Sequence, residues 1–399
     1  MEPVISEPEF CPNPSCRYHS RESARDQQWY CRFGTFETRC RGEIQRFRCN
    51  ACGKTCSTQT FSVHYWTHST SDLGWLVERI YGCGGLRQTG RFAGVTYRVI
   101  ENRVRRLARN ALAVMDLALS ELTLDEDLAF DGFESYTRSQ YHPNNITHVV
   151  GKKSEFIYAA VHTLLRRKGS MSPLQKRLRA LIELVWSPVS TIREDVTALL
   201  ADLAPAIEGA CGRRAEVSLH TDKHRSYRPA IKAVASLAAL LRDGKLLHKR
   251  TSSRAARTAK NPLFVVNYVD RQMRKNMAEH VRETVRQGRE VNCQMERMAL
   301  FMVAHNFLTP RRITDHARTG NQPTHAMAAG ISSEALRQQV HRLLTHRHVW
   351  SHLRSGQGWI TSIWQHLHEN PPAVRLKKGR LEVRSVALAP RALPAHLLA

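Results

Sequence analysis

The stretch AEVSLHTDKHRSY, residues 215–227, contains a short apolar segment from Val217 to Leu219 and then Asp222. Apolar residues bounded by polar ones predict a short buried strand. Aspartate is common at strand ends and caps, so turn chemistry alone would explain Asp222. The alternative is that the carboxylate is a metal ligand.

Acidic residues stand at comparable places elsewhere in the chain. In DLAFDGFESY (127–136), an apolar run leads into Asp131, and the apolar segment PLFVVNYV (262–269), which we expect to be a strand, leads into Asp270 and a helix. Further elements are expected between them: strands at 145–150 and 155–164, helices within 172–210, and a helix from about 229 to 241.

The resulting order is strand, strand, strand, helix, strand, helix, strand, helix. The acids stand on the first strand, on the fourth strand and at the start of the last helix. This layout is typical of an RNase H-like fold, in which converging carboxylates hold two divalent cations for phosphoryl chemistry. One such aspartate alone would favour a turn or a cap. Two strand-end acids in corresponding places reverse that preference, because their mutual repulsion needs a cation to offset it.

Cysteines are concentrated at the N-terminus, where seven of the ten lie within the first 56 residues. CPNPSC supplies Cys11 and Cys16, and CNAC supplies Cys49 and Cys52. Two such knuckles separated by a β-rich stretch predict a zinc ribbon, in which four thiolates form a tetrahedron. Buried free thiols are the alternative.

Three further cysteines of this region, Cys31, Cys40 and Cys56, are expected to be packing residues. Trp29, Phe33, Phe36, Ile44 and Phe47 suit a small sheet between the knuckles.

The stretch GGLRQTGRFAGVTYRVIENRVRRLARN (84–110) resembles a helix-turn-helix. A first helix from about Leu86 to Ala93, a turn at Gly94 and a second helix capped by Thr96 fit its composition. One face of the second helix is polar and could read a major groove, since Arg pairs with guanine and Asn with adenine. The candidate DNA contacts are Arg98, Asn102, Arg105 and Arg109. A packed helix hairpin with a solvated basic face is the alternative.

The chain has 399 residues, a hydrophobic fraction of 42% and a formal net charge of +25, with 60 Lys and Arg against 35 acids. This composition excludes a disordered chain and favours a polyanionic partner, nucleic acid before membrane. The start has no signal-peptide pattern, and the longest apolar run, around 233–241, is too short to span a bilayer. We therefore expect a cytoplasmic, nucleoid-associated protein with reduced cysteines.

The order of these motifs along the chain carries more information than each motif alone. The knuckles CPNPSC and FRCNACGKTCS, the helices at 84–110, FDGFES, HTDKHRSY and the segment from NPLFVVNYVDRQMRKNMAEHVRETVRQGR to MERMALFMVAHNF cover residues 11 to about 307. In this order they resemble a bacterial insertion-sequence transposase of the DDE type. The resemblance implies cleavage and strand transfer of double-stranded DNA at the element ends and target, with magnesium or manganese as cofactor and a homo-oligomer on DNA.

The third acid is open between two residues. The resemblance implies Glu with a basic residue seven positions later, and Glu279 with Arg286 fits. Helix periodicity favours Asp270 instead, because Met273, Met277, Val281 and Val285 lie within about 60° of it on one apolar face. Glu279 falls on the far side of the same predicted helix. We therefore expect Asp131, Asp222 and Asp270 to be the catalytic, cation-binding acids, with Glu279 as the alternative.

The predicted organisation is α+β and multidomain. A zinc ribbon (1–66) precedes a helix-turn-helix region (70–125), an RNase H-like catalytic domain (126–310) with a helical insertion at about 170–210, and a basic, partly helical C-terminal region (311–399) with a loose tail. Two other functions fit the same features. One is a DNA-binding regulator with an inactive RNase H-like domain, and the other is a structure-specific nuclease.

Overall fold

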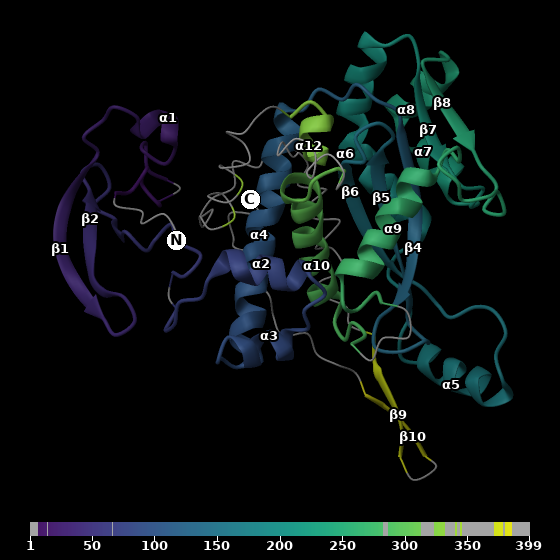
Figure 1. Ribbon diagram of the computed structural model, residues 1–399, viewed down its shortest axis with the longest axis horizontal. Coiled ribbons are helices and arrows are strands. Elements are labelled where there is room, and N and C mark those ends of the chain that lie inside the picture. The colour runs from purple at the N-terminus through teal and green to yellow at the C-terminus, as the bar shows by residue number, and fades with distance from the viewer. Residues whose placement is uncertain are drawn as a thin grey trace.

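The chain forms, in sequence order, a small three-stranded sheet, a group of helices and a five-stranded mixed sheet flanked by further helices (Figure 1). The computed structural model describes residues 7–13, 15–65, 67–281, 286–312, 323–331, 340, 344, 371–377 and 380–384.

The N-terminal sheet is antiparallel. Its elements are the short helix α1 (Arg21–Ala24) and the strands β1 (Tyr30–Thr38), β2 (Gly42–Cys49) and β3 (Thr55–Ser57). Trp29, Ile44 and Phe47 are buried as expected, whereas Phe33 and Phe36 on β1 are exposed. Successive side chains of β1 point to opposite faces, and all of them from Cys31 to Glu37 are exposed, so neither face of this strand is covered.

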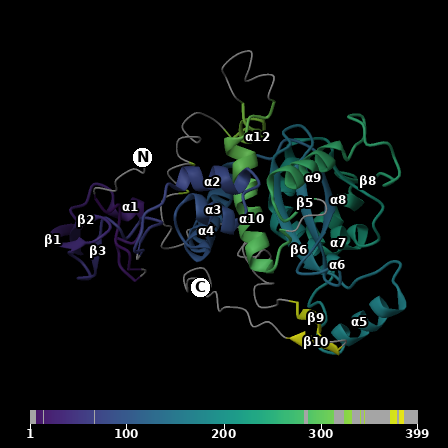
Figure 2. The same cartoon turned by 60° about the horizontal axis from the view of Figure 1, so that its bottom comes forward.

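Three helices follow: α2 (Leu73–Tyr81), α3 (Leu86–Phe92) and α4 (Tyr97–Glu121). The predicted helix-turn-helix pair corresponds to α3 and α4, with Gly94 at φ 65° in the turn between them. Thr96 stands at the N-cap of α4, but its side chain makes no capping hydrogen bond. Helix α4 continues well beyond the predicted end and packs along α10 (Val291–Val303), as Figures 1 and 2 show.

The large sheet has the strand order β6-β5-β4-β7-β8. The first three strands are antiparallel neighbours, and β7 and β8 join parallel to β4. The strands are β4 (Leu128–Tyr136), β5 (Pro143–Gly151), β6 (Ile157–Leu164), β7 (Val217–Thr221) and β8 (Leu246–Arg250). Four of them lie where the apolar patterns predicted strands.

The expected strand at 262–269 is wrong. These residues begin α9 (Phe264–Asn276), and the fifth strand is β8. Val265, Val266, Val269 and Met273 are buried with helical rather than alternating spacing, so β-branched composition misled the prediction. β8 went unrecognised because its second half is exposed and basic.

Helix α9 also ends earlier than predicted. Its C-cap is Met277, whose backbone is extended. Glu279 therefore lies beyond the helix, and the angular argument that placed it on the far side does not apply. Val281, expected on the buried face, is exposed. The prediction for Val285 lies outside the described residues.

Helices connect the later strands. The expected helical insertion is α5 (Pro173–Glu183) with α6 (Ile192–Arg213). The single helix expected at about 229–241 is divided into α7 (Tyr227–Ala233) and α8 (Ala235–Arg242), because Val234 has an extended backbone with ψ 110°.

The two faces of the sheet have different neighbours. His148 on β5 lies 3.4 Å from Asp270 of α9, so α9 covers its face. Asn145 of β5, paired with Thr163 of β6, points to the other face, since three positions separate Asn145 from His148. The Thr163 hydroxyl donates to Asp195 of α6 across 2.6 Å, so α6 covers that face.

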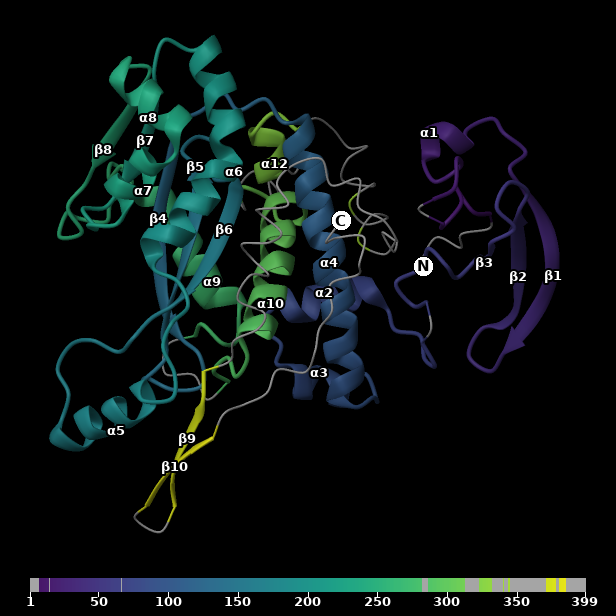
Figure 3. The same cartoon turned by 180° about the vertical axis from the view of Figure 1, so that it is seen from behind.

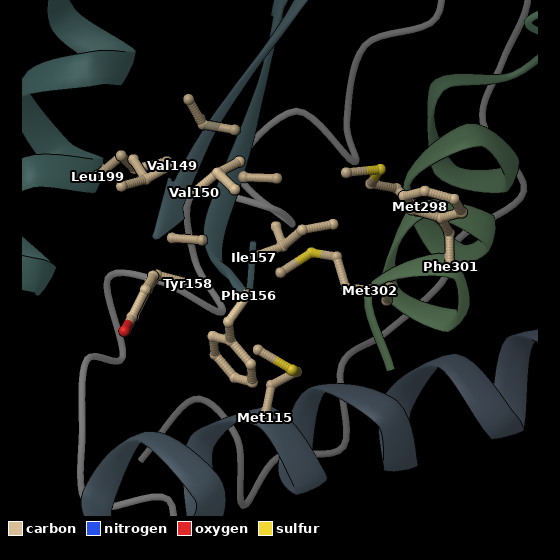
Figure 4. Close-up of a cluster of buried hydrophobic side chains, with 14 of the residues drawn as sticks. Met115, Val149, Val150, Phe156, Ile157, Tyr158, Leu199, Met298, Phe301 and Met302 are labelled. Carbon is tan, nitrogen blue, oxygen red and sulfur yellow. The ribbon is translucent and has the colours of Figure 1, made fainter. Parts of the chain in front are cut away.

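One buried cluster joins the helical region to the large sheet. Figure 4 shows Met115 of α4 and Met302 of α10 around Phe156 and Ile157, with Tyr158 and the β5 residues beyond them. All these side chains are almost completely buried. The described residues of the predicted 70–125 and 126–310 regions therefore share one core, while the cysteine-rich region has a separate one.

Only parts of the predicted 311–399 region are described. They include the short helix α12 (His325–Ala328) and the hairpin of β9 (Ala373–Lys377) with β10 (Arg380–Arg384); the π-helix η1 (Ala304–Leu308) precedes them. The expected loose tail lies outside the described residues. Among the helices of the described residues, none has the length and apolar character needed to cross a bilayer.

Candidate functional site

The four predicted cysteine ligands come together. The Sγ atoms of Cys11, Cys16, Cys49 and Cys52 all lie within 4.8 Å of one another. Cys11 and Cys52 are separated by 3.5 Å, and Cys16 and Cys49 by 3.7 Å. A tetrahedral zinc site with Zn–S bonds of about 2.3 Å requires S···S separations of about 3.8 Å, so these thiols could hold zinc.

The local backbone explains this convergence. Cys49 ends β2, and the turn after it passes through Gly53 at φ 69°, a conformation that glycine adopts without strain. The thiols of Cys11, Cys16 and Cys49 are buried, while Cys52 is exposed. Without a metal the group shares its protons unevenly: burial raises the pKa values of Cys11 and Cys16, whereas for Cys52 hydrogen bonds outweigh burial and lower the pKa to about 6. Thiolate is the form that binds metal.

The remaining N-terminal cysteines differ in their surroundings. Cys56 is buried, and burial raises its pKa to about 12, which fits a packing residue. Cys40 is half-buried and Cys31 is exposed, so the packing role expected for Cys31 is wrong.

The predicted DNA-contact residues of α4 are not equivalent. Arg98 and Asn102, in the first turns of the helix, are exposed. Arg105 lies 3.6 Å from Glu101 and 3.7 Å from Glu296 of α10, so its charge is already paired, and Arg109 is half-buried. The end of α4 nearest α3 is therefore the part of this face that is open to a partner.

Asp131 and Asp222 stand on neighbouring parallel strands. Phe130 of β4 pairs with Thr221 of β7, so the next residue on each chain is one of the two acids. Adjacent strands lie about 4.8 Å apart, which brings both carboxyl groups to one end of the β4–β7 pair. Gly132 follows Asp131, and a Cβ at Gly132 would collide with the Asn145 side chain, which explains the glycine in FDGFES.

Asp270 reaches the same place from α9. Val266, Val269 and Met273 bury the face of this helix that lies against the sheet. The Oδ1 atom of Asp270 lies 3.4 Å from Nε2 of His148, the residue that pairs with Asp131 across β4 and β5. The helix that contains Asp270 thus packs directly on the strand pair that contains Asp131.

The charges of Asp222 and Asp270 both act on the Asp131 carboxyl, although in the described part of the chain the three acids do not form a group of ligand atoms within 4.8 Å of one another. The pKa of Asp131 is raised to about 6, first by burial and then by the negative charges of Asp222 and Asp270. The pKa of Asp270 is raised to about 7, again mainly by burial, while the charges of Arg274 and Arg257 oppose the shift. Buried, mutually repelling carboxylates are chemically suited to hard divalent cations.

Glu279 has a different environment. Its Oε1 atom lies 3.1 Å from Nε of Arg297, and both side chains are buried. Arg297 also donates to the backbone carbonyl of Gly84, between α2 and α3. Glu279 is thus one half of a buried ion pair beside the helical region.

Two residues that the sequence analysis did not select adjoin the acids. The buried Tyr227 hydroxyl donates to Oδ1 of Asp131 across 3.3 Å, and its ring packs edge-on against Phe130. His148 is fully buried, and its Nδ1 donates to the carbonyl of Ile146. Tyr227 could have been noticed five residues after Asp222, but the place of His148 depends on strand register.

Among the described residues, Nε2 of His148 and Oδ1 of Asp270 are buried and lack any well-formed hydrogen bond. A cation beside Asp270 would satisfy this carboxylate oxygen, and oxygen ligands are those that magnesium and manganese prefer.

Comparison with known proteins adds no assignment. No family model matches the chain, and no curated protein is significantly similar to it in sequence.

Proposed function

We propose that the protein is a DDE-type transposase, in which an RNase H-like domain cleaves DNA strands and joins them to a target with divalent cations. The observation that carries the proposal is that Asp131 and Asp222 directly follow the paired residues Phe130 and Thr221, while Asp270 of α9 lies 3.4 Å from His148, the β5 residue that pairs with Asp131. The strand order is compatible with it, since three antiparallel strands are followed by two that join in parallel, although the fifth strand is β8 and not the segment expected at 262–269.

The other parts of the chain agree with this function. A cysteine site that could bind zinc and the exposed Arg98 and Asn102 of α4 would contact the element ends, and the net charge of +25 suits a polyanionic partner. A DNA-binding regulator would need the ribbon and the helices but not three converging carboxyl groups.

Some of the residues would bind the cations, and others hold these ligands in place. When bound, divalent cations would supply a stronger nucleophile and stabilise the leaving oxygen. Asp131, Asp222 and Asp270 would hold them. Tyr227 and the backbone N–H of Gly132 hold the Asp131 carboxylate in place by hydrogen bonds to Oδ1.

Isosteric removal of each charge tests this proposal. Asp131→Asn, Asp222→Asn and Asp270→Asn should each fold and bind DNA but lose strand cleavage and joining in manganese, because the cation ligand is lost while the shape is kept. The substrate is a duplex selected from a random library by its affinity for the wild-type protein. Retained cleavage in Asp131→Asn or Asp222→Asn would refute the assignment, and wild-type cleavage without joining would favour the nuclease.

A further inference from the structure

The segment that connects β8 to α9 is strongly basic. Between Asp243 and Asp270 the sequence contains six Lys or Arg residues and no Asp or Glu. Four of the six fall within the loop and its entry, namely Arg250, Arg254, Arg257 and Lys260, and all four side chains are exposed. The ion pairs of the described residues include none of these four.

This loop has a defined conformation. The backbone N–H of Thr251 donates to the carbonyl of Thr221, one residue before Asp222. One turn is closed by Ala255 N–H and the carbonyl of Ser252, and the side chain of Asn261 donates to the carbonyl of Ala256. The arginines therefore project from fixed turns that are tied to the strand end of the acidic site.

The cations lie beside the acids on one side and beside α7 on the other. Arg254 and Arg257 lie on the loop whose first residue, Thr251, is hydrogen-bonded to Thr221 beside Asp222. His248 on β8 has its pKa lowered to about 4 by burial and then by the charges of Arg250 and Arg228, which places Arg228 of α7 beside the start of the loop.

Helix α7 extends this positive surface. Arg228 and Lys232 of α7, with Arg193 at the start of α6, line a pocket of about 390 Å³ that also contacts Pro229 and Ala233. Helix α7 begins with Tyr227, the residue that holds Asp131. The cations thus run from the pocket across the β8 end to the acidic site.

We propose that this basic band, Arg228, Arg250, Arg254, Arg257 and Lys260, binds the phosphate backbone of duplex DNA beside the three acids. Unpaired like charges on one loop repel one another, and a polyanion removes that repulsion. Phosphate contacts fix the position of a duplex without reading its sequence. The inference deepens the proposed function and rests on it: α4 would select the sequence, and the basic band would hold the scissile strand.

The test compares two double variants with equal loss of charge. Arg254→Gln with Arg257→Gln removes two cations of the band, and Lys176→Gln with Arg177→Gln removes two exposed cations of α5, which lies well apart from β8 in Figures 1 and 3. Binding of a duplex of arbitrary sequence is measured from 50 to 200 mM salt, with thermal melting as the control for folding. The band variant should have a salt slope smaller by roughly 2, so that this rise in salt lowers its affinity about tenfold less than that of the wild type.

The outcomes separate the two proposals. A band variant with the salt slope of the α5 variant would overturn the band. A wild type that binds duplex through the band but never cleaves it would refute the transposase and leave the band as a DNA-binding surface. A band variant that loses the preference for selected over arbitrary duplexes would also contradict the proposal, because phosphate contacts are independent of sequence.

Discussion

Glu279 and Asp270 illustrate how the surroundings of a carboxylate decide its role. Glu279 lies 3.1 Å from Arg297, and both are buried, whereas Asp270 lies beside the buried His148 and close enough to Asp131 for its charge to act on that carboxyl. Glu279 thus has an arginine as its charge partner, whereas Asp270 adds a negative charge beside Asp131. The structure thus gives a physical reason to keep Asp270 as the predicted third acid.

The two acids should therefore respond differently to loss of charge. Glu279→Gln should lower the free energy of unfolding by about 3 kcal/mol, because it leaves Arg297 charged and buried without its partner. Binding of manganese should remain unchanged. Glu183→Gln is the matched control, since Glu183 also pairs with an arginine, Arg179 at 2.8 Å, but on the surface of α5, where such a pair contributes about 0.3–0.5 kcal/mol.

Denaturant titration of both variants measures the difference. Equal stability of Glu279→Gln and Glu183→Gln would contradict the buried ion pair. A loss of manganese binding in Glu279→Gln would return this residue to the catalytic set.

At the scale of elements, the cysteine-rich N-terminal sheet, which is the predicted ribbon, and the large sheet are separate units of packing. The ribbon core consists of the cysteines with Phe10, Trp29 and Phe61, and its buried cluster is distinct from that of the rest of the molecule. A small sheet of this size has little apolar surface to bury, so we expect a metal held by the four cysteines to stabilise it.

Removal of the metal should thus unfold the ribbon alone. Cys49→Ser with Cys52→Ser should lose one zinc per chain and the order of the ribbon, since structural zinc contributes on the order of 10–16 kcal/mol. Hydrogen exchange should become fast in β1 to β3 and stay slow in β4 to β6. Cys31→Ser with Cys40→Ser is the control and should keep its zinc. Zinc retained by the first variant would disprove the ligand assignment.

At the scale of the whole molecule, buried histidines connect stability to pH. His305 of η1 stacks on His325 of α12 with ring centroids 4.0 Å apart. Burial, followed by the charge of His325, lowers the pKa of His305 to about 3, and burial with the charges of Arg311 and Arg312 lowers that of His325 to about 4. Both rings are therefore neutral in the folded protein, and their neutral form packs η1 against α12.

Acid should accordingly destabilise the protein. Below pH 6.5 the unfolded chain binds protons at these histidines while the folded chain does not, so the free energy of unfolding falls as pH decreases from 6.5 towards 4. His305→Gln should reduce this slope by about 1.4 kcal/mol per pH unit. Denaturant midpoints at several pH values measure it, with the exposed His68→Gln as control. A slope unchanged by His305→Gln would show that the pair is not neutral in the fold.

The sequence by itself determined what depends on short spacing. The cysteine knuckles, the helix pair α3–α4 and the strands β4 to β7 follow from local patterns, because tight turns and alternating burial leave a direct trace in the residues. Asp131 and Asp222 could be selected for the same reason, since each stands at a fixed place on a recognisable strand.

Only the tertiary structure decided the features that depend on distant partners. β8 is a strand because β7 offers it an edge, and 264–276 is a helix because its valines meet the sheet at helical spacing. The end of α9 at Asn276 and the contact of Arg297 with Glu279 likewise have no local signal. The free energy of these choices comes from burial and pairing across the fold, so neighbouring residues in the sequence could not reveal them.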